Sequence, residues 1–85
     1  MRGADRTWVV FSTPECQPGR VVAERLRTSE PSSQVTLVDP RREPRLAEAY
    51  KVDQVPAVLL ANRYGQVEAR LIGQPAIESG LAGVA

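Results

Sequence analysis

The side chain best suited to covalent chemistry in this sequence is that of Cys16, the only cysteine among the 85 residues. It lies in the stretch PECQPGR, residues 14–20, where Pro18 suits the first turn of a helix because its missing N–H costs nothing there. A cysteine at a helix start faces unpaired backbone N–H groups and the positive end of the helix dipole. Both favour the thiolate, the form that attacks disulfides. Cys16 is therefore the candidate nucleophile.

The alternative is that Cys16 is a small, inert residue, because free cysteines are often buried. The prolines and polar residues on both sides of it favour an accessible thiol instead. Among these neighbours, Arg20 supports the thiolate by its charge, whereas Glu15 opposes it.

Composition excludes several other kinds of site. The sequence has no histidine, which excludes histidine acid–base catalysis and histidine-ligated metals. One cysteine excludes an internal disulfide and a cysteine-cluster metal site within one chain. The net charge of +1 argues against nucleic acid as the main partner, and the apolar runs are far shorter than the ~20 residues that cross a membrane. The N-terminus lacks an apolar signal region, so a cytoplasmic location is expected.

Short apolar runs and turn signals predict alternating strands and helices. In the segment QVEARLI, alternation predicts a half-exposed strand with Val67, Ala69 and Leu71 on one face. In the last helix, Ile77, Leu81 and Val84 share a face. The expected strands span residues 7–11, 35–39, 57–62 and 66–72, and the expected helices lie within 18–28, 40–51 and 74–85.

The resulting order, β-α-β-α-β-β-α, predicts one α/β domain over residues 1–85. The first two strands are joined through a helix and should be parallel with a right-handed crossover. The last two should form an antiparallel hairpin. We therefore expect a four-stranded mixed sheet with helices on both faces.

Two stretches in this order, FSTPECQPGR and VDQVPAVLL, resemble the thioredoxin superfamily. Phe11 leads into the motif, Pro18 stands where the family's Cys-Gly-Pro-Cys has its proline, and Gly73 matches the glycine that closes the last strand. The resemblance covers roughly residues 8–84 and lacks the extra N-terminal strand and helix of thioredoxin proper, which makes the size nearer to that of glutaredoxin. It implies a thioredoxin-like fold and a cis peptide bond before Pro56.

The departures from the family pattern matter for function. The resemblance places Gly19 where the family has its second, resolving cysteine. Glu15 replaces the tryptophan before the first cysteine, and Val10 replaces a buried aspartate that assists proton transfer. Ala57 stands where a threonine follows the cis proline. The resemblance thus implies that capture of a thiol partner by Cys16 remains, while release by a second cysteine is lost.

Two functions follow from this reading. The first is one-cysteine thiol–disulfide exchange at Cys16, with mixed disulfides to a protein or small thiol, glutathione among the candidate co-substrates, and no bound cofactor or metal. The second is a non-catalytic peptide-binding or scaffold domain. A third reading is that Gly19 was engineered to trap a mixed disulfide. We expect a monomer that binds neither nucleic acid nor membrane. The residues expected to line the substrate or peptide groove are Gln17, Pro18, Val55 and Pro56.

Overall fold

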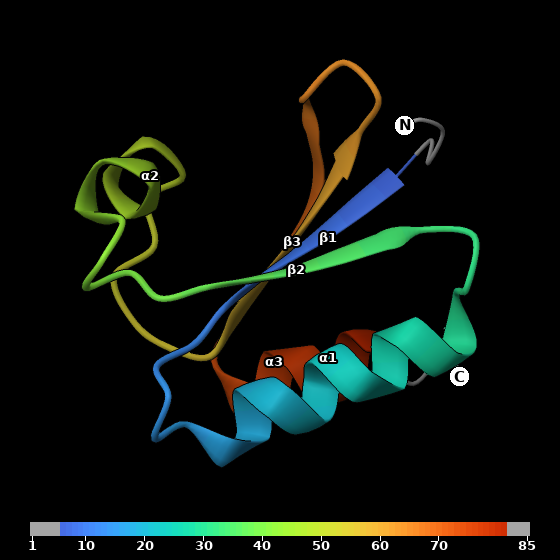
Figure 1. Cartoon of the computed structure of the whole chain (residues 1–85), viewed down its shortest axis with the longest axis horizontal. Coiled ribbons are helices and arrows are strands. Elements are labelled where there is room, and N and C mark those ends of the chain that lie inside the picture. The colour runs from blue at the N-terminus through green and yellow to red at the C-terminus, as the bar shows by residue number, and fades with distance from the viewer. Residues whose placement is uncertain (1–5, 82–85) are drawn as a thin grey trace.

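The computed structural model describes residues 6–81, and Figure 1 shows a central sheet with helices on both of its faces. The spatial order of the strands is β2-β1-β3-β4. This architecture confirms the predicted α/β class and element order. Along the chain the elements are β1 (Arg6–Phe11), α1 (Gln17–Ser29), β2 (Gln34–Val38), α2 (Pro44–Ala49), β3 (Ala57–Asn62), β4 (Val67–Ile72) and α3 (Gln74–Leu81).

The strand pairings agree with the predicted topology. β1 runs parallel to β2, and β3 runs antiparallel to both β1 and β4. β1 therefore lies inside the sheet, while β2 and β4 form its two edges. The crossover between β1 and β2 passes through α1, which lies with α3 on one face of the sheet, and α2 lies on the other (Figure 1).

Side chains from each face of the sheet form a separate apolar cluster, because successive strand residues point to opposite faces. On one side, Phe11 makes an edge contact with Tyr50, with ring centroids 6.3 Å apart. The buried cluster on this side consists of Phe11, Val38, Ala47, Ala57 and Leu59. The cluster beneath α1 and α3 consists of Trp8, Val10, Val22, Ala23, Leu26, Val58, Leu60 and Ile77.

The predicted face of β4 is wrong at one residue. Ala69 and Leu71 pack against the cluster beneath α1 and α3, as expected. The register between β3 and β4 shifts beside Ala61, however, so that Ala61 pairs with Val67. A bulge of this kind adds one residue to one strand and reverses the alternation beyond it. Val67 therefore leaves the predicted face and remains 38% exposed.

The predicted face of the last helix is confirmed at Ile77, which is fully buried. Its predicted partner Val84 lies outside the described residues.

The start of α1 approaches the end of β1 so closely that residue 19 has no room for a side chain. A Cβ on Gly19 would overlap the Oγ and the Cβ of Ser12. Both residues are buried, and the Ser12 Cβ is fixed to its backbone, so it cannot swing away. A side chain at position 19 would therefore force a shift of the backbone at Ser12 while position 12 carries a side chain.

We predict that Gly19→Ala destabilises the fold by about 1–3 kcal/mol, as overpacking of a core does. This predicted loss of stability is opposite to what helix propensity alone would give, because alanine stabilises a helix interior by about 1 kcal/mol relative to glycine. Urea unfolding measures the difference, and Ser12→Gly is the matched background because it removes the overlapping atoms. In that background the change at residue 19 should be neutral or stabilising. A Gly19→Ala protein as stable as wild type would show that the close approach is absent.

Candidate functional site

Three connections meet at one end of the sheet. Phe11, the last residue of β1, pairs with Val38 at the end of β2 and with Ala57 at the start of β3. The segments that follow β1 and β2 and the segment that precedes β3 therefore leave the sheet side by side (Figure 1). This arrangement brings the Cys16 loop, residues 12–16, next to the segment that contains Pro56.

Cys16 is the N-cap residue of α1 and is half-buried. Its backbone is extended, with φ −85° and ψ 90°, and its side chain makes no capping hydrogen bond. Its backbone N–H donates to the Thr13 carbonyl at 2.9 Å. The Ser12 hydroxyl lies 3.1 Å from the Thr13 carbonyl oxygen and 3.3 Å from that of Cys16, so it can donate to either. The loop is thus held by its backbone and by Ser12, which leaves the sulfur uninvolved in capping.

Ser12 is the site residue that the sequence did not single out. The Cys16 Sγ lies 3.7 Å from the place that a Cβ of residue 19 would take. The thiol thus lies beside position 19, as the resemblance implies. The space for a side chain at that position is filled by Ser12 instead. A polar residue directly after an apolar strand was the only sequence signal for this role.

The Val55–Pro56 peptide bond is cis, which confirms the expectation from the resemblance. Pro56 is buried, and its carbonyl accepts a hydrogen bond from the Gly73 N–H at 2.9 Å. Gly73 has a φ of 86°, a conformation that favours glycine. This bond fixes the segment before β3 to the end of β4. Val55 is half-buried against the Phe11 cluster rather than fully exposed.

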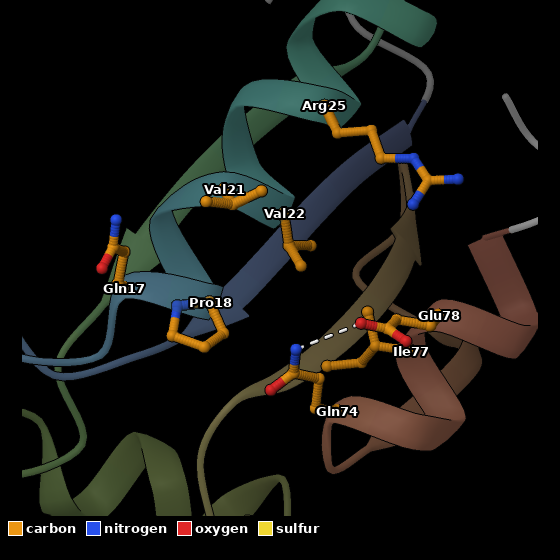
Figure 2. A pocket seen from close by; sticks show the side chains of 8 residues that line it. All are labelled: Gln17, Pro18, Val21, Val22, Arg25, Gln74, Ile77 and Glu78. Atoms are coloured by element: carbon orange, nitrogen blue, oxygen red, sulfur yellow. Dashed lines mark hydrogen bonds between the residues drawn. The ribbon is translucent and has the colours of Figure 1, made fainter.

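Gln17 and Pro18 line a groove of about 270 Å³ between α1 and α3. Figure 2 shows Pro18, Val21 and Val22 of α1 on one side of it and residues of α3 on the other. Val21 is 58% exposed here, whereas its neighbour Val22 is buried. The groove is lined by Gln17, Pro18, Val21, Val22, Arg25, Gln74, Ile77 and Glu78.

The predicted binding residues therefore divide between two places. Gln17 and Pro18 continue directly from Cys16 and line the groove between α1 and α3. Pro56 lies on the neighbouring connection, and Val55 packs toward the opposite core. The Gln74 side chain closes part of the groove rim by donating to Glu78 at 3.1 Å (Figure 2).

Arg41 links the Cys16 loop to the segment after β2. Its guanidinium lies 3.2 Å from the Glu15 carboxylate and 3.3 Å from that of Asp39. Arg41 thus places a positive charge against Glu15, the one acidic residue next to Cys16.

Asp39 carries the clearest electrostatic shift of the site. Hydrogen bonds from the Arg41 guanidinium, and then from the Arg41 backbone N–H, hold the pKa of Asp39 below its ordinary value. The same pairing raises the pKa of Arg41. A depressed carboxyl pKa stabilises the fold above the unfolded pKa of ~4, and this contribution is lost as the pH falls through the lower folded pKa.

Among residues 6–81, no group of histidine, cysteine, aspartate and glutamate side chains could hold a metal ion. No helix in the same range is long and apolar enough to cross a membrane.

We predict that Arg41→Gln raises the Asp39 pKa toward its ordinary value, because both the charge and the guanidinium hydrogen bonds disappear. An NMR titration of the Asp39 carboxyl carbon measures the change. Arg42→Gln is the control, since Arg42 acts on Asp39 only through its charge and more weakly than Arg41 does. Equal shifts in the two variants, or none in Arg41→Gln, would contradict the described ion pair.

The fold was compared with known proteins. No family model and no curated protein sequence matches the chain. Among solved structures, the oxidised mitochondrial thioredoxin 3 of Saccharomyces cerevisiae is 21% identical with a TM-score of 0.75, over 96% of this chain and 78% of that one. A mutant thioredoxin from Halobacterium salinarum is 21% identical with a TM-score of 0.74, over 94% and 72%.

Thioredoxin from Fasciola hepatica is similar to the same degree, at 20% identity and a TM-score of 0.72, over 96% of this chain and 83% of that one. These likenesses cover nearly the whole chain, and their low identity limits what they show to the fold. The protein thus has the fold of the thioredoxin superfamily, with a single cysteine at the start of its first helix.

Proposed function

We propose that the protein exchanges disulfides through Cys16 alone, with a protein or small-thiol partner. The observation that carries this proposal is the position of the sulfur, half-buried at the N-cap of the 13-residue helix α1. The first N–H groups of a helix have no partner within it, and they and the helix dipole attract negative charge. Arg41 pairs with Glu15, so the one carboxylate next to Cys16 faces a positive charge.

The proposed reaction has two steps. The Cys16 thiolate attacks one sulfur of a mixed disulfide between a protein thiol and glutathione, which forms a bond to the glutathione sulfur and releases the protein thiolate. A second glutathione thiolate then attacks the glutathione sulfur on Cys16. Oxidised glutathione leaves, and the Cys16 thiolate is regenerated. Electrons balance, since each step forms one S–S bond and breaks another.

The second step needs an outside thiol, because this chain has no other cysteine. A cytoplasmic location would supply one, since glutathione keeps thiols reduced there. In this proposal Gly19 is the position of the lost resolving cysteine, and Ser12 occupies the space that its side chain would need.

The proposed substrate site joins two places, with Gln17 and Pro18 beside the thiol and Val55 and Pro56 on the neighbouring connection. An extended peptide could pair with the backbone of Val55 as an added strand. Pro18 and Val21 offer a separate apolar surface in the groove between α1 and α3.

We predict that the wild-type protein removes glutathione from a glutathionylated peptide and that Cys16→Ser abolishes this turnover. Mass spectrometry should detect a glutathione adduct on Cys16 when the second thiol is left out. Thr13→Ser is the control, because it changes the same loop and keeps the thiol. A wild-type protein that forms no adduct and shows no turnover would overturn the proposal.

A second prediction tests the geometry around position 19. Gly19→Cys alone should not form a disulfide with Cys16, because its side chain would overlap Ser12. The double variant Ser12→Gly/Gly19→Cys should form one under mild oxidation. The Cys16 Sγ lies 3.7 Å from the place of the new Cβ, and about 1 Å of adjustment gives bonding distance. Mass spectrometry of the intact protein detects this disulfide as the loss of two hydrogens. A disulfide in the single variant, or none in the double, would contradict the described packing.

The second candidate function is peptide binding without exchange. The groove between α1 and α3 favours it, because its apolar wall requires no thiol. The Cys16→Ser variant separates the two candidates. Partner binding that survives in this variant, without any adduct in the wild type, supports a binding domain.

A further inference from the structure

β2 forms one edge of the sheet and pairs only with β1 among the residues that the structure describes. The Val38 carbonyl accepts a hydrogen bond from the Ser12 N–H at 2.9 Å, so the backbone groups of Val38 point toward β1. In a strand the hydrogen-bonding groups of successive residues point to opposite sides. The N–H and C=O groups of Val35 and Leu37 therefore point outward from the sheet.

This edge lacks the features that prevent pairing with another chain. The segment QVTLV contains no charge and no proline, and its Leu37 side chain is 41% exposed. β4, the opposite edge, carries Glu68 and Arg70 and a bulge in its pairing with β3. Charges and bulges are the usual protection of edge strands, and a flat uncharged edge is a template for strand addition. The two edges thus differ, and only β2 is suited to pairing.

We propose that β2 pairs antiparallel with β2 of a second copy of this chain, about a two-fold axis through Thr36. This goes beyond the proposed thiol exchange and does not depend on it. In this register Val35 lies opposite Leu37 of the second copy, and each of these pairs exchanges both backbone hydrogen bonds. Thr36 faces its own counterpart as a non-hydrogen-bonded pair, in which threonine side chains interact favourably.

The segment is self-complementary in this register, as a two-fold interface requires. The outward backbone groups belong to two residues placed symmetrically about Thr36, so each finds its counterpart without a shift. Leu37 and Val35 lie on the same face of the sheet, so the exposed Leu37 would be covered by an apolar neighbour. No like charges meet, because the strand carries none. For these reasons a second copy fits this edge, and the proposal differs from the monomer expected from the sequence.

The pairing would also reach the Cys16 loop. Leu37 lines a groove of about 200 Å³ together with Ser12, Thr13 and Arg20. A second β2 strand beside Leu37 would form an outer wall for this groove, and the two Cys16 loops would lie at opposite ends of the shared strand pair.

Analytical ultracentrifugation of the full chain over a range of concentrations tests the association. We expect a concentration-dependent dimer for the wild type and a monomer for Leu37→Lys, which places a charge in the pair. Val67→Lys is the matched control, because Val67 lies on the other edge and is 38% exposed against 41% for Leu37. It should remain dimeric. A wild type that stays monomeric, as it would if this edge binds a foreign peptide, overturns the proposal. So does a dimer that survives Leu37→Lys.

A cross-link tests the register. In the Cys16→Ser background, Thr36→Cys should form an intermolecular disulfide on mild oxidation. Non-hydrogen-bonded antiparallel partners have Cα atoms about 4.5 Å apart, which is within the range that a disulfide spans. Glu68→Cys in the same background is the control on the opposite edge and should remain reduced under these conditions. Cross-linking of both variants at equal rates would show random collision and overturn the two-fold pairing.

Discussion

The site depends on the pairing of β1 with strands on both of its sides. β1 is parallel to β2 and antiparallel to β3, so the last residue of β1 lies between the end of one neighbour and the start of the other. This register places the Cys16 loop, Arg41 and the segment of Pro56 at one end of the sheet. A slip by one residue would turn every β1 side chain to the opposite face, and both buried clusters would lose their contacts. The two clusters therefore fix the register on which the site depends.

The contact between Gly19 and Ser12 gives a second constraint, and it changes how Gly19 is understood. From the sequence alone, Gly19 was a position from which a cysteine was missing. In the structure, Gly19 is also the point of closest approach between α1 and the end of β1. The two residues are coupled, because a side chain at position 19 would overlap the side chain of Ser12. A second cysteine placed at position 19 would therefore call for a smaller residue at position 12.

Much of the fold could be predicted because its signals are local. Buried strands appear as short apolar runs, and β3 spans the residues that its run predicts, Ala57–Asn62. Contacts between distant segments could not be predicted in this way. The bulge that exposes Val67 depends on the partner strand, and the link from Arg41 to Glu15 joins two loops. In the same way, the contact of Ser12 with Gly19 exists only because the start of α1 approaches the end of β1. Cys16 and the cis bond at Pro56 were expected from motifs, whereas the residues that hold them in place were not.

In the proposed exchange, the packing around Cys16 influences which sulfur of the mixed disulfide an outside thiol attacks. Thiol–disulfide exchange on a mixed disulfide at Cys16 can occur at either sulfur, and only attack on the partner's sulfur regenerates the Cys16 thiolate. On the side of position 19, Gly19 and Ser12 are both buried, so an outside thiol has no approach to the Cys16 sulfur from there. In the proposed mixed disulfide, the partner's sulfur would lie away from this packed side, where a second thiol can reach it. In this proposal, Ser12 packed against Gly19 would thus favour attack by an outside thiol at the sulfur that completes the cycle.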